Sequence, residues 1–208
     1  MNAENKSLKD VYESRRAVNF FLKDKAIPDE ILKSIIDLAV LAPSAFNLQP
    51  WELIAVKSEE AKQNLLPLAM NQPKILEAPV TLILIGDLEG YGAQNPEWSV
   101  MEAAMGKEAV DGYKQFAAML YGSTDERKVK FAESNAGLLA MSIMYAAKYY
   151  GVDSHPMSGI DFEGIRKEYG LGDSKTPVML ISLGYFDEEK QLYPRRNRLG
   201  YDEIVKEL

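Results

Sequence analysis

The arginines of this chain lie mostly near its two ends. Five of the seven form two clusters, which are Arg15 and Arg16 and then Arg195, Arg196 and Arg198. The planar guanidinium group binds phosphate and carboxylate oxygens in pairs, so clustered arginines suit an anionic ligand. The rest of the chain is acidic, and the net charge is −7. Two interpretations are open: solvated basic termini, or two clusters that converge on one anion.

A second stretch combines prolines with uncharged polar side chains. Ser44, Asn47 and Gln49 lie between Pro43 and Pro50. Carboxamides both donate and accept hydrogen bonds, so they suit the edge of a planar heterocycle with alternating donors and acceptors. The alternative is that these side chains satisfy backbone groups at a helix end and turn.

Composition excludes several kinds of site. The chain has no cysteine and one histidine, His155. Disulfides, iron–sulfur clusters, thiolate zinc sites, cysteine nucleophiles and multi-histidine metal sites are therefore excluded. The acidic balance disfavours nucleic-acid and acidic-membrane binding. Met1–Asp10 has no signal-peptide core, and no apolar stretch reaches the roughly 18–20 residues of a membrane span, so we expect a soluble cytoplasmic protein.

Three glycines follow an apolar segment without matching a nucleotide-binding motif. Gly86, Gly90 and Gly92 have the order G-x-x-x-G-x-G, with the acidic Asp87 and Glu89 between them. A dinucleotide loop has a different spacing, and two negative charges would repel a pyrophosphate. The pattern favours a turn.

These residues must be positioned by a chain that mixes helices and strands. The sequence predicts one domain over residues 1–208, long enough to bury a sizeable core. Helical spacing and cap residues predict helices over Ser7–Arg16, from Pro28 to Pro43, from Ser58 to about Met70, over Trp98–Leu120 and Asp125–Tyr150, after Asp161, and near the C-terminus. Apolar runs predict strands over Trp51–Val56, Val80–Ile85 and Val178–Tyr185. A doubly wound sheet would need more regular alternation.

The longest predicted helix is apolar on nearly every face between Ala136 and Ala147. A helix that is hydrophobic all round is buried or lies in an interface. We expect this helix to lie in the core and also to contribute to a dimer.

Four motifs in order carry a family resemblance. They are Arg15-Arg16 followed by Asn19-Phe20-Phe21, Pro43-Ser44-x-x-Asn47-x-Gln49-Pro50-Trp51, His155-Pro156-Met157-Ser158-Gly159-Ile160-Asp161, and Arg196-x-Arg198. Over about residues 10–205 the chain resembles the FMN-dependent nitroreductases, and it looks closest to the NAD(P)H nitroreductases of the quinone-detoxification type. The resemblance implies an α+β fold. It is a three-layer sandwich in which helices flank a central mixed sheet, and two chains intertwine as a homodimer.

The resemblance also implies an activity. FMN at the dimer interface would take a hydride from NAD(P)H at flavin N5. It would then reduce a small flat acceptor such as a quinone or nitroaromatic, in a ping-pong sequence. The cofactor supplies this chemistry, so no side chain is assigned as catalyst. Two alternatives stay open: a flavin-binding redox sensor or carrier, and other flavin chemistry such as enone reduction, azoline oxidation or dehalogenation.

Residue by residue, the resemblance implies a set of cofactor contacts. The arginine pairs match phosphate ligands, the Ser44 stretch matches ring contacts across a dimer interface, and the Ser158 loop matches a backbone approach to flavin N5. The positions that match are Arg15, Arg16, Ala17, Asn19, Pro43, Ser44, Ala45, Asn47, Gln49, Asn71, Lys74, Pro156, Met157, Ser158, Gly159, Arg196 and Arg198.

Two positions depart from the family pattern. Asn19 stands where many members have a lysine or arginine near flavin N1 and O2. A neutral amide there predicts a lower flavin potential, unless Lys74 compensates. Ala17 replaces a frequent serine, so one phosphate hydrogen bond is missing. We further expect Phe46 to be a wall of the substrate space, and His155 to be a structural loop residue with no role in proton transfer.

Overall fold

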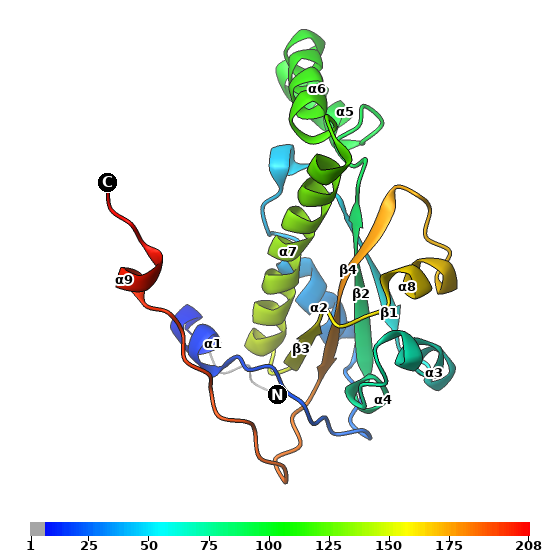
Figure 1. Ribbon diagram of the computed structural model, residues 1–208, viewed down its shortest axis with the longest axis vertical. Helices are drawn as coiled ribbons and strands as arrows, with labels where there is room; N and C mark the ends of the chain where they lie inside the picture. The colour runs from blue at the N-terminus through cyan, green and yellow to red at the C-terminus, as the bar shows by residue number, and fades with distance from the viewer. Residues whose placement is uncertain (1–6) are drawn as a thin grey trace.

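Three of the four strands form where aliphatic residues are frequent, and Figure 1 shows where the strands lie in the fold. The computed structural model describes residues 7–208. Its sheet has four strands in the order β1-β2-β4-β3, and every neighbouring pair is antiparallel. The strands are β1 Trp51–Val56, β2 Val80–Asp87, β3 Asp153–Met157 and β4 Lys175–Gly184.

Four of the helices begin at side chains that accept a backbone hydrogen bond. Ser7, Ser58, Thr124 and Asp161 each cap the first turn of a helix in this way, which satisfies an otherwise unpaired N–H. No helix in the described part of the chain is long and apolar enough to cross a membrane. The helices are α1 Leu8–Ser14, α2 Asp29–Ala39, the short 3-10 helix η1 Ala45–Asn47, α3 Glu59–Leu68, α4 Lys74–Glu77, α5 Glu97–Met105, α6 Lys107–Tyr121, α7 Asp125–Tyr149, α8 Phe162–Glu168 and α9 Tyr201–Ile204.

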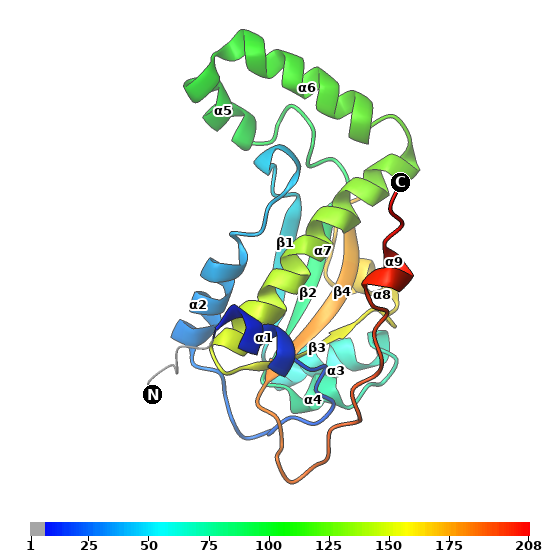
Figure 2. The same ribbon diagram turned by 90° about the vertical axis from the view of Figure 1, so that its left-hand side faces the viewer.

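Helices cover both faces of the sheet, as the predicted three-layer sandwich requires (Figure 2). On one face α2 and α7 pack against the strands through a core that includes Ile35, Leu139 and Ile143. On the other face α3, α4 and α8 bury a second core around Leu65 and Ile165. Burial of these side chains away from water is the main force that assembles the layers.

The sheet itself corrects one prediction, because it is antiparallel and not mixed. The segment with α3 and α4 leaves and rejoins the sheet at the same end, where Val56 pairs with Thr81, so β2 must run opposite to β1. Helix α7 carries the chain back along the sheet, and β3 and β4 then pair antiparallel as well. In the described residues, parallel pairing is limited to an isolated bridge between Ala17 and Ser154.

Two further differences concern secondary structure. The helix predicted over Trp98–Leu120 is two helices, because Gly106 has φ +86° and ψ 150° and turns the chain between α5 and α6. Strand β3 lies where the sequence predicts a loop around His155, and its pairing with β4 forms it despite Pro156. The glycines after β2 form a turn as predicted, with the Gly92 N–H donating to Glu89 O at 2.8 Å.

Candidate functional site

The segment after α1 lies along the edge strand β3. Ala17 bridges Ser154, and the Val18 N–H donates to Ser154 O at 3.1 Å. His155 Nδ1 in turn donates to Val18 O at 2.9 Å. These bonds fix the arginines at the end of α1 relative to the sheet.

The two arginine clusters converge in space. Arg195 donates to the carbonyl oxygens of Glu13 at 2.5 Å and Arg15 at 3.4 Å. Arg16 donates to the carbonyl oxygen of Tyr193 at 2.6 Å. Burial of Arg15, and the nearby charges of Arg195 and other arginines, lower the pKa of Arg15. We call this set the terminal arginine cluster, and its members are Arg15, Arg16, Arg195, Arg196 and Arg198.

The cluster carries uncompensated positive charge. Within residues 7–208, no member of it forms an ion pair with a carboxylate. That is unusual in a chain with 31 acidic residues, where carboxylates are abundant. Guanidinium groups bind carboxylate and phosphate oxygens in pairs, and several of them together match the charge of a phosphate dianion. The donor set therefore fits a phosphate ester.

Lys74 is the first residue of α4 and lies near the end of the sheet where β2 begins. Hydrogen bonds through Gln72 link it to the Ser158–Gly159 loop. Lys74 Nζ donates to Gln72 Oε1 at 3.2 Å, and Gln72 Nε2 donates to Gly159 O at 3.4 Å. Burial lowers the pKa of Lys74. Burial and the charge of Lys74 lower the pKa of His155 to about 4, so His155 is neutral at pH 7.

The remaining predicted residues of this region differ in what they can offer a ligand. Ser158 and Gly159 are exposed, and Asn19 is half-buried. The side chain of Met157 packs in the core, so only its backbone faces outward. Pro156 pairs with Ile181 inside the sheet. The Asn71 backbone is left-handed, with φ 54°, and its side chain is exposed.

The Ser44–Gln49 loop is built by its own polar side chains and by α5 and α7. The Gln49 N–H donates to Ser44 Oγ at 2.9 Å, and Asn47 Nδ2 donates to Glu97 Oε1 at 2.9 Å. The Ala45 N–H donates to Asn135 Oδ1 at 2.8 Å. Gln49 Nε2 also donates to Asn47 O at 3.2 Å. Local satisfaction of backbone groups, the simpler interpretation, thus accounts for Ser44 and for one donor of Gln49, although Asn47 and Gln49 remain exposed. Pro43 lies outside this network, at the rim of an apolar groove.

One chain does not bring all of the predicted residues together. The Ser44–Gln49 loop precedes Trp51, which pairs with Gly86 at one end of β2, whereas Lys74 precedes Val80 at the other end. The eight residues of β2 separate the two ends by roughly 25 Å. Figure 2 shows the same separation, with η1 beside α5 and α4 at the far end of the sheet.

The sequence did not single out Gln72 or Arg195 as site residues. Gln72 gains its significance only from tertiary contacts with Lys74 and Gly159. Arg195 belongs to the C-terminal arginine run, and its contact with the end of α1 distinguishes it. The sequence identifies the C-terminal group of arginines, but it does not show that Arg195 is the one that contacts the end of α1.

Comparison with known proteins agrees with the fold. The sequence model described as the Nitroreductase family matches residues 12–185. One relative is YodC of Bacillus subtilis (strain 168), which is named provisionally as an NAD(P)H nitroreductase. The two sequences are 35% identical over 180 residues, which cover 84% of this chain and 87% of YodC. The chain belongs to the Nitroreductase family and is an oxidoreductase of that family.

Two solved structures show the same fold over the whole length. SE1966 of Staphylococcus epidermidis ATCC 12228, named provisionally as an NAD(P)H:FMN oxidoreductase, has a TM-score of 0.88 and 27% identity, covering 100% of this chain and 98% of SE1966. A nitroreductase-like protein of Exiguobacterium sibiricum 255-15, solved in complex with FMN, has a TM-score of 0.83 and 25% identity, covering 97% of each chain. The α+β fold is therefore that of nitroreductases.

Proposed function

We propose that this protein is an FMN-dependent oxidoreductase that takes a hydride from NADH or NADPH and reduces a flat acceptor such as a quinone or nitroaromatic. The observation that carries the proposal is the convergence of the two arginine clusters at the end of α1. His155 ties the segment after α1 to β3 and also feels the charge of Lys74. Phosphate and an aromatic ring system then have separate places on one surface, as a flavin mononucleotide requires.

Each side chain of this surface has a definite task in the proposal. The terminal arginine cluster binds the phosphate, and Lys74 provides a cation beside the ring. Exposed backbone groups at Ser158 and Gly159 of the same chain approach the flavin ring. His155, held neutral by burial and by Lys74, orients Val18 and transfers no proton. When bound, FMN supplies the hydride and electron chemistry, so the chain's contribution is position and electrostatics.

The second half of the site must come from another copy of the chain. The Ser44–Gln49 loop is roughly 25 Å from Lys74 within one chain, so both can touch one flavin only in a homodimer. A groove of about 600 Å³ between α1, α2 and α7 supports this proposal. Its lining is almost wholly apolar and includes Leu8, Leu41 and Leu138, which are 72%, 77% and 48% exposed. An exposed apolar face of this kind marks a protein interface.

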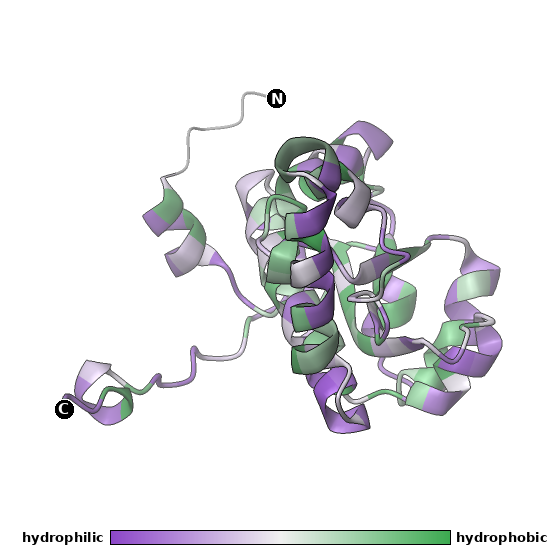
Figure 3. Ribbon diagram, turned by 90° about the horizontal axis from the view of Figure 1, so that it is seen from above, coloured by the Kyte–Doolittle hydropathy of each residue, from purple (hydrophilic) through white to green (hydrophobic). Residues whose placement is uncertain are grey.

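The C-terminal segment supports the same assembly. The part of the chain after β4, which carries α9, is called the C-terminal arm. Figure 3 shows that the end of this arm stands away from the rest of the chain. Tyr201 and Ile204 of α9 are 61% and 67% exposed in one chain. A second copy would give this arm a surface on which to bury them.

The first experiment is an absorbance spectrum of the purified protein, followed by anaerobic addition of NADH or NADPH. We expect flavin bands that bleach and return when a quinone is added. Arg15→Gln removes one charge-assisted phosphate contact, which is worth about 1.5–3 kcal/mol, or roughly 10- to 100-fold in the FMN dissociation constant. Arg166→Gln is the matched control, because Arg166, on α8, is paired with Glu163 of the same helix and with Asp173 after it.

Mixed dimers test whether two chains share each site. Arg15→Gln and Asn47→Ala homodimers should each bind FMN weakly. A mixed dimer of the two variants has one site with both substitutions and one with neither, so it should recover about half of the wild-type FMN binding. No recovery would show that each site lies within one chain. Bound flavin that NAD(P)H does not reduce would favour a sensor or carrier, and a protein that binds no FMN would refute the proposal.

A further inference from the structure

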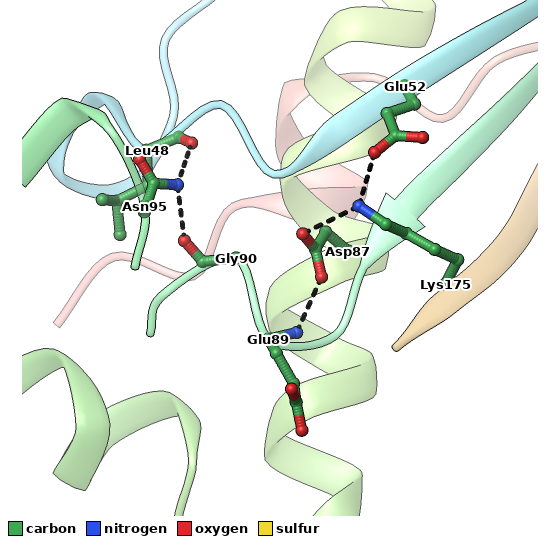
Figure 4. Close-up of polar contacts among 7 residues, drawn as sticks. All are labelled: Leu48, Glu52, Asp87, Glu89, Gly90, Asn95 and Lys175. Atoms are coloured by element: carbon green, nitrogen blue, oxygen red, sulfur yellow. Dashed lines mark hydrogen bonds and ion pairs between the residues drawn. The ribbon is translucent and has the colours of Figure 1, made fainter. Parts of the chain in front are cut away.

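A single amide side chain links the Ser44–Gln49 loop to the turn after β2. Asn95 Nδ2 donates to Leu48 O at 2.8 Å and to Gly90 O at 2.7 Å, as Figure 4 shows. Its Oδ1 accepts from the Glu97 N–H at 2.9 Å, at the start of α5. Asn95 is half-buried and has all three polar directions occupied. It therefore joins three separate segments at one point.

The loop that Asn95 holds is conformationally strained. Phe46, Asn47 and Gln49 have φ values of 52°, 55° and 48°. A non-glycine residue in this left-handed region costs roughly 1–2 kcal/mol, because its Cβ approaches the following carbonyl oxygen. Three such residues in one short loop persist only where contacts from outside the loop over-determine its shape.

The start of α5 supplies the other outside contacts. Glu97 accepts the hydrogen bond from Asn47. Trp98 is fully buried, its Nε1 donates to Gly92 O at 2.9 Å, and its ring lies 5.8 Å from that of Phe46. Loop, turn and α5 are thus one unit, in which Trp98 links the segments through its ring and Asn95 links them through backbone hydrogen bonds.

The turn itself is a firm base for this unit. A Cβ on Gly90 would lie 2.6 Å from Pro50 Cβ, so the turn and the loop are in close contact there. Figure 4 also shows Lys175 Nζ between Glu52, at 2.5 Å, and Asp87, at 2.9 Å. These ion pairs fix the end of β2 on which the turn is built.

We propose that Asn95 is a positioning residue, which fixes the Ser44–Gln49 loop in the conformation that contacts the flavin of the neighbouring subunit. The proposal rests on the proposed function for the identity of that ligand. Asn95 does not touch the cofactor. It acts through the Leu48 carbonyl and places the flavin loop and α5 in a fixed relation.

Two substitutions separate this role from simple capping of α5. Asn95→Asp keeps an oxygen for the Glu97 N–H but loses both donors and sets a carboxylate against two carbonyl oxygens. Asn95→Ala loses both donated hydrogen bonds and the accepted one. Both variants lose the two hydrogen bonds that hold the loop, so we expect an FMN dissociation constant roughly tenfold or more above wild type for each.

Hydrogen exchange of the FMN-free protein gives a readout that does not depend on flavin. The amides of Asn47 and Leu48 donate within the loop at 3.0 Å, and we expect both to exchange faster in Asn95→Asp. Amides of α5 should keep their wild-type rates in Asn95→Asp and exchange faster in Asn95→Ala. Ser58→Ala, which removes the cap of α3 on the far side of the sheet, is the control for stability loss and should leave FMN affinity within twofold of wild type.

The outcomes are distinct. Wild-type loop exchange and FMN affinity in Asn95→Asp would show that Asn95 only caps α5, and the proposal would be wrong. Faster loop exchange with unchanged FMN affinity would overturn the positioning role and leave the proposed function intact. A wild-type protein that binds no FMN would overturn the proposed function itself.

Discussion

The pH dependence of stability follows from the environment of His155. Burial of the ring, and then the charge of Lys74, lower its pKa from 6.5 to about 4 in the folded chain. In the unfolded chain the ordinary value of about 6.5 applies. Between these two values the unfolded state binds more protons, so acid favours unfolding. The contribution of this group to stability is complete above pH 6.5 and is lost as the pH falls toward 4.

The magnitude can be bounded from the same pKa values. The difference between 6.5 and about 4 corresponds to at most ~3 kcal/mol, at 1.36 kcal/mol per pKa unit. Solvent reaches part of the half-buried ring, so we expect about 1–2 kcal/mol. That is a measurable fraction of the 5–15 kcal/mol of a typical domain.

The assay compares wild type with His155→Asn in urea unfolding from pH 4.5 to 7.5. Asparagine keeps an N–H near Nδ1 for Val18 O but does not titrate. The wild-type free energy of unfolding should fall relative to the variant as the pH is lowered, while the many carboxylates affect both proteins equally. Because the chain has one histidine, a single imidazole NMR signal reports the pKa directly. An imidazole that titrates near pH 6.5, or a difference in stability independent of pH, would refute the reasoning.

Three other substitutions test separate parts of the account. Asn19→Lys should raise the flavin reduction potential, because a partly buried cation stabilises the reduced cofactor by about 1–3 kcal/mol; redox titration showing an unchanged or lower potential would count against it. Gly106→Ala should cost about 1–3 kcal/mol of unfolding free energy at a φ of +86°. Gly112→Ala, inside α6, is its control and should instead stabilise by about 0.5–1 kcal/mol; equal effects in urea unfolding would contradict the assignment. Leu138→Glu should convert the proposed dimer to monomer in light scattering, and a dimer that persists in the variant would place the interface elsewhere.

The sequence predicted the helices that have cap residues and the strands that consist of a mostly apolar run. The strand Trp51–Val56 has the predicted bounds, and Ser58 and Asp161 cap helices as expected. Strand β3 was not predicted, because Asp153–Met157 is short and contains a proline, and only its partner β4 makes it extended. Gly106 was overlooked because helical spacing continues on both sides of it, whereas the break depends on one backbone angle.

For the candidate site, the sequence indicated which residue types could bind a ligand, but not which residues form hydrogen bonds with one another. The clustered arginines indicated an anion, and the structure brings the clusters together. The links through Gln72 and Asn95 join segments that are far apart in sequence, so no local pattern could mark them. Such residues become visible only when their hydrogen-bond partners are known.

Backbone strain gives an independent indication of where the ligand lies. In the described part of the chain, the non-glycine residues with positive φ occur in two places, the loop at Phe46, Asn47 and Gln49 and the turn at Met70 and Asn71. The family resemblance assigns flavin contacts to residues of both segments, Asn47 and Gln49 in the first and Asn71 in the second, although the segments lie at opposite ends of the sheet. Strain of this kind persists where a fixed shape is needed before ligand arrives. Because the two strained segments lie at opposite ends of the sheet in one chain, the strain supports the proposal that a second chain completes the site.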